Sequence, residues 1–354
     1  MRKFEIHHKK TCKTPSMAMA ALFSSFVLMI GVFLLPVLLW GRASAEERTA
    51  LSGETSPPQG EGRGTGEDGL EPAGLSRGEP IRVLLGDGSV ASLPLEEYIW
   101  GVVAAEMPAS FQPEALKAQA VAARTYAARQ AQSGRHAGAD VCADSACCQA
   151  YRPRQELLER WGDKGEEYAQ KLAAAVAATQ GEVLRYNGNL ITAAFHSSSD
   201  GATADALQVW GSAQPYLTSV STPETEKEVP NFREEVAFSP EEFAALWTEK
   251  YPQAALEGEP EGWFTKLERT AWGGVGSVTV GGVSVTGGEV RAALGLRSTR
   301  FTVTADGEKV RFTTTGYGHG VGMSQYGANV LAAQGQTYRQ ILAHYYTGTT
   351  LEPL

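Results

Sequence analysis

The chain has 354 residues, with 31 Lys and Arg against 40 Asp and Glu, and a formal net charge of −9. This acidic balance, without a basic stripe, excludes the charge pattern typical of nucleic-acid-binding proteins. The length is sufficient for a sizeable hydrophobic core, and the sequence shows no internal repeat.

The first 78 residues have the composition of an anchor and a tether. A basic segment over 1–16 precedes an apolar stretch over 17–40, which is long enough to cross a bilayer. The basic flank is expected to stay in the cytoplasm, so that the rest of the chain is exported from a single-pass anchor in the cell membrane. Residues 41–78, rich in Gly, Pro, Ser and Glu, are expected to form a disordered linker. Because Ala-Ser-Ala at 43–45 resembles a signal-peptidase site, a cleaved signal peptide is the alternative.

Residues 79–354 carry alternating helix and strand patterns. They predict a β-hairpin over 81–93, helices over 95–106, 114–132 and 155–179, strands over 182–186 and 190–196, a helix over 239–251, strands over 264–270 and 278–285, a hairpin over 301–314, and helices over 323–333 and 338–346. The expected fold class is α+β, with a helix-rich N-terminal half and a strand-rich C-terminal half in one two-lobed extracytoplasmic domain.

Glu106 is the carboxylate with the most informative surroundings. It follows the apolar run over 99–105 and precedes Met107-Pro108. Apolar neighbours raise the pKa of a carboxyl group, so that it can hold a proton near neutral pH, as a general acid must. A glutamate that caps or solvates a helix end is the alternative.

Three blocks of sequence resemble the stage II sporulation protein D family, peptidoglycan-cleaving enzymes of spore-forming bacteria. The blocks are LEEYIWGVVAAEMP with KAQAVAARTYA over 95–127, FHSSSDGATADALQVWGSAQPYLTSVST over 195–222, and GYGHGVGMSQYGANVLAAQGQTYRQILAHYYTGTTLE over 316–352. They occur in the family's order, and the resemblance covers residues 81–354. It implies a lytic transglycosylase that acts on peptidoglycan during engulfment in sporulation, with Glu106 as the catalytic acid.

A lytic transglycosylase requires one protein carboxylate, whereas glycoside hydrolysis usually requires two. The carboxyl protonates the oxygen between N-acetylmuramic acid and N-acetylglucosamine. It then takes the proton of the substrate's own C6 hydroxyl, which closes on C1 to give a 1,6-anhydro sugar without consuming water. The resemblance assigns this role to Glu106, and no second carboxylate of the motif is equally well placed.

Polar residues of three segments are expected to line the same cleft and bind the glycan. They are Lys117, Gln119, Arg124 and Tyr126 of the predicted helix, His196, Ser197, Ser198 and Ser199 at a predicted strand end, and His319, Ser324 and Gln325 of a glycine-rich segment. Strand-end loops commonly carry binding groups, and glycines allow the backbone to approach a ligand closely. A solvated helix face and structural histidines are the alternatives.

The segment that contains His196 allows other interpretations. Asp200 stands where related sequences usually have a glycine, which leaves the loop's shape open. A Ser-His-Asp triad is disfavoured because these residues are consecutive, whereas a triad is assembled in space. Four aromatic residues are candidates for stacking on sugar rings, with core packing as the alternative: Trp210, Tyr216, Tyr317 and Tyr326.

Four potential metal ligands have the spacing His-x5-Cys-x4-Cys-Cys. They are His136, Cys142, Cys147 and Cys148. Thiolates and imidazole bind zinc, and four such ligands close a tetrahedral structural site. In the resembling family a metal-binding cluster occupies this loop, commonly with His at the position of Cys147. A Cys142–Cys148 disulfide with Cys147 free is the alternative in an exported protein.

Two functions from different classes are compatible with these features. One is a membrane-anchored lytic transglycosylase, and the other is a non-catalytic wall-binding protein that enhances a peptidoglycan amidase. A zinc hydrolase is disfavoured because four protein ligands leave no position for water. The resemblance implies as partners the glycan strands, a membrane sporulation protein and a peptidoglycan amidase/endopeptidase, and no nucleic acid.

Overall fold

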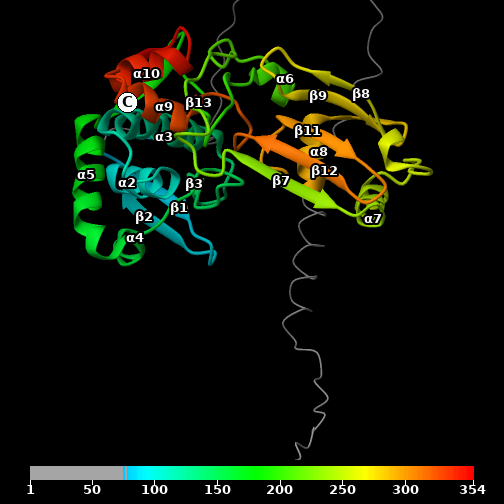
Figure 1. The fold of residues 1–354 in the computed structure, drawn as a ribbon. Coiled ribbons are helices and arrows are strands. Elements are labelled where there is room, and N and C mark those ends of the chain that lie inside the picture. Colours follow the sequence, from blue (N-terminus) through cyan, green and yellow to red (C-terminus); the bar gives the residue numbers. More distant parts are fainter. Residues whose placement is uncertain (1–74, 76–77) are drawn as a thin grey trace, which may run out of the picture. The chain divides into compact units, whose positions relative to one another are not determined.

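Two consecutive helices rich in apolar and small residues form the centre of the helical part (Figure 1). In the computed structural model, which describes Leu75 and residues 78–354, helix α2 (Leu95–Glu106) buries every residue from Tyr98 to Ala104. A helix that is apolar on all sides has to be enclosed by other elements. Helix α3 (Pro113–Ser133) packs against α2 and supplies a largely alanine surface, which permits close approach. Both helices occur where the sequence predicts them.

Helix α3 contacts elements from three later parts of the chain. These are α5 (Gly165–Ala178), β4 (Glu182–Tyr186) and the terminal pair α9 (Gln325–Ala333) and α10 (Tyr338–Tyr345). The main hydrophobic cluster therefore includes residues from both ends of the described chain. The predicted hairpin is also confirmed, with β1 (Pro80–Leu84) antiparallel to β2 (Val90–Pro94) and a short third strand, β3 (Val141–Cys142), parallel to β1.

The predicted helix over 155–179 is wrong as a single element. It consists of α4 (Arg154–Trp161), a 3-10 turn η1 (Gly162–Lys164) and α5. Gly162 has φ 55°, a left-handed conformation that glycine adopts without steric cost and that interrupts a right-handed helix.

A second hydrophobic cluster is built mainly from strands (Figure 1). One sheet has the order β11 (Phe301–Ala305), β12 (Val310–Thr315), β7 (Arg233–Phe238), and another has β10 (Val283–Thr286), β9 (Val275–Val280), β8 (Phe264–Arg269). Helices α7 (Pro240–Lys250) and α8 (Gly287–Leu294) complete the cluster. The predicted hairpin over 301–314 is confirmed. The strand predicted over 278–285 is instead two strands joined at Gly281 and Gly282, both with positive φ.

The segment over 190–196, predicted as one strand, divides between two sheets. Its start belongs to β5 (Asn189–Leu190), which pairs with β4, while β14 (Thr350–Pro353) pairs with the other edge of β4. Its end is β6 (Phe195–His196), which runs parallel to β13 (Met323–Ser324). The first two residues of the helix predicted over 323–333 form that strand, and α9 begins at Gln325.

The described residues thus have a mixed α+β fold, as the sequence predicts. Short helix α6 (Ala206–Trp210), together with α8, β7 and β14, was not predicted. The predicted anchor over 17–40 and almost all of the linker over 41–78 lie outside the described residues. Within the described part of the chain, no helix combines the length and the apolar character needed to span a bilayer.

Candidate active site

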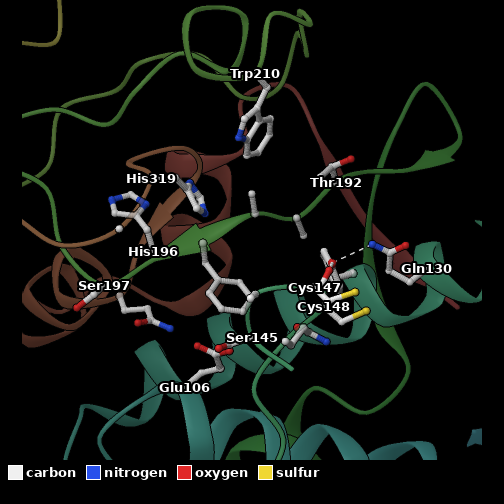
Figure 2. Close-up of a pocket in the computed structure, with 18 of the residues that line it drawn as sticks. Glu106, Gln130, Ser145, Cys147, Cys148, Thr192, His196, Ser197, Trp210 and His319 are labelled. Atoms are coloured by element: carbon white, nitrogen blue, oxygen red, sulfur yellow. Dashed lines mark hydrogen bonds between the residues drawn. The ribbon is translucent and has the colours of Figure 1, made fainter. Parts of the chain in front are cut away.

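A cavity of about 860 Å³ lies where α2, α3, the segment over 145–149, β6, α6, α8 and the glycine-rich segment meet. Figure 2 shows Glu106 on one side of this cavity and Trp210 on the opposite side, with His196 and His319 next to each other between them. Among the described residues, Glu106 supplies the only carboxylate that lines the cavity.

Glu106 ends helix α2 and is partly buried. Burial raises the pKa of its carboxyl group above the ordinary value, while the Ala150 N–H and the Gln325 side chain oppose the rise without cancelling it. The Ala150 backbone N–H donates to Oε1 of Glu106 at 2.7 Å. Because Oε1 accepts this bond, the acidic proton is expected on Oε2. The expectation of a carboxyl that holds its proton is therefore consistent with its surroundings.

The segment that contains Ala150 packs tightly on helix α2. The rings of Tyr98 and Tyr151 stack with centroids 5.4 Å apart. A Cβ atom on Gly101 would lie 2.5 Å from the Tyr151 ring and 2.8 Å from the Arg152 carbonyl oxygen. Glycine at position 101 is therefore what allows this segment to come close enough for Ala150 to reach Glu106.

The four predicted metal ligands lie together beside the cavity. The potential ligand atoms of His136, Cys142, Cys147 and Cys148 are all within 4.8 Å of one another, and the three cysteines are free thiols. Nε2 of His136 is 3.2 Å from Sγ of Cys148 and 3.8 Å from Sγ of Cys147. Tetrahedral zinc with bonds of about 2.0–2.3 Å requires ligand separations of roughly 3.4–3.8 Å. The donor set fits a closed zinc site, and the two separations from His136 lie near the tetrahedral values.

This cluster is connected to Glu106 through the chain. Cys147 and Cys148 themselves line the cavity, and Ala150 follows two residues later. The carbonyl oxygen of Cys147 accepts hydrogen bonds from Tyr126 Oη at 3.4 Å and from Arg135 Nη1 at 3.3 Å. Two of the potential ligands and the N–H group that contacts the carboxyl therefore lie within one stretch of four residues, 147–150.

His196 and His319 are neighbouring imidazoles, with ring centroids 5.8 Å apart. Nδ1 of His196 donates to the Val321 carbonyl oxygen at 3.2 Å, so that its Nε2 accepts from Ser199 Oγ at 2.6 Å. Nδ1 of His319 accepts from the Val321 N–H at 3.1 Å. Burial and the neighbouring His319 lower the pKa of His196 to about 3, and burial and Arg291 lower that of His319 to about 4. Both imidazoles are therefore neutral near pH 7, and both ring nitrogens of His196 are already engaged within the protein.

Of the four predicted aromatic residues, two line the cavity. Trp210 and Tyr317 are 42% and 47% exposed, so that their rings are available to a ligand. Tyr216 is buried, and its ring centroid is 5.5 Å from that of Tyr186. Tyr326 packs edge-on against Phe111 at 4.9 Å. The last two are packing residues.

Three of the four predicted binding residues of α3 are not at the cavity; only Tyr126 lines it. Lys117 forms an ion pair with Glu114 at 2.6 Å, one turn away on the same helix. Arg124 is fully buried and pairs with Glu96, with Nε at 2.9 Å from Oε1. Gln119 is also fully buried, and its amide atoms have no hydrogen-bond partner among the described residues. The expectation that all four share the cleft of Glu106 is therefore corrected for these three.

The predicted serines also divide into residues that line the cavity and residues that do not. Ser197 lines the cavity, whereas Ser198 and Ser199 line a smaller adjoining pocket. The Ser324 hydroxyl accepts the Gly327 N–H at the start of α9, and α9 then places Gln325 at the cavity.

Glu224 is a buried carboxylate that the sequence reasoning missed. It accepts the Ser199 backbone N–H at 2.8 Å and hydrogen bonds from the hydroxyls of Ser324 and Thr222. The Tyr345 hydroxyl is 3.0 Å from that of Thr222. Glu224 thereby joins the loop after β6 to the beginning of α9, which carry His196 and Gln325. No motif marks it, because its partners come from distant segments.

Comparisons with known proteins agree with the resemblance seen in the sequence. A family model described as "Stage II sporulation protein" matches residues 86–186. The chain is 41% identical over 266 residues to "Stage II sporulation protein D" of Bacillus subtilis, covering 74% of this chain and 76% of that protein. The corresponding protein of Bacillus amyloliquefaciens is 40% identical, with 74% and 75% covered.

A more distant relative has a different name. The "Amidase enhancer" of Bacillus subtilis is 32% identical over 303 residues, covering 71% of this chain and 40% of that protein. Together, the family model and the extent of the similarity show the family of this chain. The chain belongs to the stage II sporulation protein D family.

Proposed function

We propose that this protein is a lytic transglycosylase that cleaves peptidoglycan glycan strands to 1,6-anhydro-muramyl products during engulfment in sporulation. The observation that carries the proposal is a single carboxylate, Glu106, with a pKa raised by burial, in a cavity of about 860 Å³. A hydrolase of the usual type requires a second carboxylate within about 5–10 Å to activate water or attack the sugar. No other Asp or Glu of the described residues lines this cavity.

In the proposed reaction, the protonated carboxyl of Glu106 donates its proton to the glycosidic oxygen as the bond to C1 breaks. The resulting carboxylate accepts the proton of the C6 hydroxyl, whose oxygen closes on C1. The Ala150 N–H keeps its bond to Oε1 and stabilises the carboxylate formed after the first step. The same residue thus acts first as an acid and then as a base, and it returns to its protonated state without water.

The neighbouring side chains would bind the sugars. Trp210 and Tyr317 present exposed rings, and an aromatic face is suited to the apolar face of a sugar. The neutral imidazole of His319 and the amide of Gln325 offer hydrogen bonds to hydroxyl and acetamido groups. Zinc held by His136, Cys142, Cys147 and Cys148 would have a structural role, since it would fix the segment that leads to Ala150.

We place the catalytic domain outside the cytoplasm, tethered to the cell membrane by the apolar segment over 17–40. The proposed partners are a membrane sporulation protein and a peptidoglycan amidase/endopeptidase. The similarity to a protein named "Amidase enhancer" supports association with an amidase. It also supports the second candidate function, a wall-binding protein that enhances an amidase without cleaving glycan itself.

One substitution separates the two functions. Glu106→Gln keeps the size and the hydrogen bond from Ala150 but removes the acidic proton, so that we expect a loss of about 10²–10⁴-fold in the rate of glycan cleavage. Glu97→Gln is the matched control, because Glu97 is an exposed residue of the same helix that does not line the cavity. Mass spectrometry of digested glycan strands distinguishes 1,6-anhydro ends from reducing ends, since the anhydro product is lighter by one water.

The proposal is rejected if the wild-type protein releases reducing ends or if Glu106→Gln cleaves at the wild-type rate. Absence of cleavage by the wild type, combined with stimulation of an amidase that Glu106→Gln retains, would establish the enhancer function instead.

A further inference from the structure

An arginine outside the cavity covers one face of an aromatic ring that lines it. Cζ of Arg297 lies 4.3 Å from the centre of the Tyr317 ring, within the range of a cation–π contact. Arg297 is half-buried in the segment between α8 and β11, and it does not line the cavity. Tyr317 does line the cavity, and its side chain is exposed. By contact, Arg297 can therefore affect a ligand only through the tyrosine.

The main chain holds the guanidinium group in this position. Nη1 of Arg297 donates to the carbonyl oxygen of Asn231 at 2.9 Å. The carbonyl oxygen of Arg297 accepts the backbone N–H of Gly318, the residue after Tyr317, at 3.0 Å. Within the described part of the chain, no carboxylate is within ion-pair distance of Arg297. Because no ion pair draws the planar group away, it can remain against the ring.

The backbone of Tyr317 is also fixed. Its N–H donates to the carbonyl oxygen of Ser198 at 2.8 Å, and its carbonyl oxygen accepts the Ser198 N–H at 3.1 Å. The freedom that remains to the tyrosine is rotation of its side chain, and the guanidinium of Arg297 restricts that rotation from one side. An exposed side chain that is ordered only when a ligand binds lowers the affinity for that ligand. Arg297 orders the ring before binding.

We propose that Arg297 is a positioning residue for glycan binding, which holds the Tyr317 ring so that a sugar packs on the ring face opposite the guanidinium. The inference rests on the proposed function and identifies a residue that sets the affinity for its substrate. A planar guanidinium stacks on one face of an aromatic ring and leaves the other face open. That open face is suited to the apolar face of a sugar.

Substitution of Arg297 in the full-length protein measures the effect. The ligand is a tetrasaccharide of alternating N-acetylglucosamine and N-acetylmuramic acid, and calorimetry in the Glu106→Gln background measures binding without cleavage. We expect Arg297→Gln to weaken binding about 2- to 10-fold, the contribution of one side chain ordered in advance. Arg297→Lys keeps the charge but not the planar group, and should show a smaller loss.

Cleavage kinetics separate positioning from a general structural effect. With Glu106 intact, Arg297→Gln should raise KM for glycan strands by the same factor without a matching fall in kcat. The reason is that the contact with the Tyr317 ring is made equally in the ground state and in the transition state. A general loss of structure would lower kcat and Tm together.

A double-mutant cycle tests whether Arg297 acts through Tyr317. Tyr317→Ala removes the ring, so that Arg297→Gln should not weaken binding further in that background. Tyr317→Phe keeps the ring and should keep the full effect of Arg297→Gln. Arg311→Gln is the matched control, because Arg311 pairs with Asp306 in the β11–β12 hairpin and does not line the cavity. It should bind the tetrasaccharide as the unsubstituted arginine does.

Equal binding with and without Arg297→Gln, or a loss of the same size in the Tyr317→Ala background, would overturn the role of Arg297 and leave the proposed function standing. If Arg297→Gln folds poorly, Arg297→Lys in the same cycle decides between these outcomes. Release of reducing ends by the wild type would overturn the proposed reaction but not the role of Arg297. Failure of the tetrasaccharide to bind would overturn both this inference and the glycan substrate on which it rests.

Discussion

Glu106 couples the protonation needed for the reaction to the stability of the fold. Its pKa is raised by burial, so that the folded protein favours the protonated form. This contribution to stability is present below the ordinary pKa of a glutamate and is lost as the pH rises through the raised value. Glu106→Gln cannot ionise, and we therefore expect it to have a higher Tm than the wild type at about pH 8 and to lose that advantage near pH 4.

Thermal unfolding of both proteins across this range measures the effect, and the difference between them removes the contribution of other titrating groups. Glycan cleavage by the wild type should decline over the same pH interval, because the general acid loses its proton. A difference in Tm that does not vary with pH would contradict the raised pKa.

Substitution of Glu224 tests whether the fold around the cavity depends on a buried carboxylate that does not line the cavity. Glu224→Ala would leave the Ser199 N–H and the hydroxyls of Ser324 and Thr222 without their buried acceptor. Hydrogen bonds to a charged group contribute about 1.5–3 kcal/mol, so that we expect the free energy of unfolding to fall by about 3 kcal/mol or more. Chemical denaturation gives the value.

The control for Glu224→Ala is Glu226→Ala, two residues away. Glu226 pairs with Arg233 at the surface, with both side chains more than 60% exposed. Such a pair contributes about 0–1 kcal/mol. Similar losses in the two variants would show that the buried network around Glu224 is not important for stability.

Single residues differ in how far the sequence reveals their role. The raised pKa of Glu106 could be predicted, because the apolar run before it is buried and the burial extends to its carboxyl group. The ion pair of Lys117 with Glu114 is local to one helix turn and was available from the spacing. The partner of Arg124 is Glu96 on another helix, and no local pattern indicates which way α3 turns relative to α2. Arg297 and Glu224 lie in segments without a motif, and only folding brings them to the site.

At the scale of elements, the segment between α3 and α4 connects a potential metal site to the carboxyl. Cys148→Ser removes one of four ligands, so that we expect the zinc content to fall from about one per chain and glycan cleavage to fall with it. The physical reason is the short path from Cys148 to the Ala150 N–H, which bonds to Glu106. Metal analysis measures the zinc content. Hydrogen exchange at Ala150 shows whether the bond from its N–H group to Glu106 is weakened.

Arg152→Gln is the control in the same segment, since Arg152 is exposed, does not line the cavity and is not a potential ligand. It should bind zinc and cleave glycan as the wild type does. A chelator that removes zinc without changing Tm, exchange at Ala150 or cleavage would contradict the structural role, and a Cys142–Cys148 disulfide in the purified protein would exclude the site.

Elements with a continuous local pattern were predicted well, and those that change partners were not. Helices α2, α3, α7 and α10 follow their apolar spacing and their start signals, including the capping box of Ser239 and Glu242 before α7. Residues 190–196 have a strand composition throughout, yet the chain passes from β4 to β13 within them. That exchange depends on residues over 120 positions later, so that local composition cannot reveal it. The same holds for β14, whose partner β4 is far away in the sequence.

At the scale of the whole described structure, the cavity depends on the return of the last helices, α9 and α10, to α3. Helices α9 and α10 pack on α3, and the glycine-rich segment before them pairs with the residues after β6. Gly318 has φ 117°, and a Cβ atom there would lie 2.8 Å from Cβ of His196. The order of the three sequence blocks indicated that they belong together. Their contact in space required the structure, because long-range pairing is not encoded in any one block.

The last prediction concerns how the chain reaches its substrate. The apolar stretch over 17–40 would extend about 36 Å as a helix, more than the roughly 30 Å of a bilayer core. It also exceeds the apolar core of about 7–15 residues that is usual in signal peptides. We therefore expect the intact chain to remain in the membrane fraction after washing with salt and alkali, with an N-terminal sequence that starts in the basic segment over 1–16. A variant without residues 17–40 is the control and should leave the membrane fraction. A soluble exported protein that begins at Glu46 would instead show cleavage after Ala-Ser-Ala at 43–45. In that case diffusion, not a tether, would bring the catalytic domain to the glycan strands.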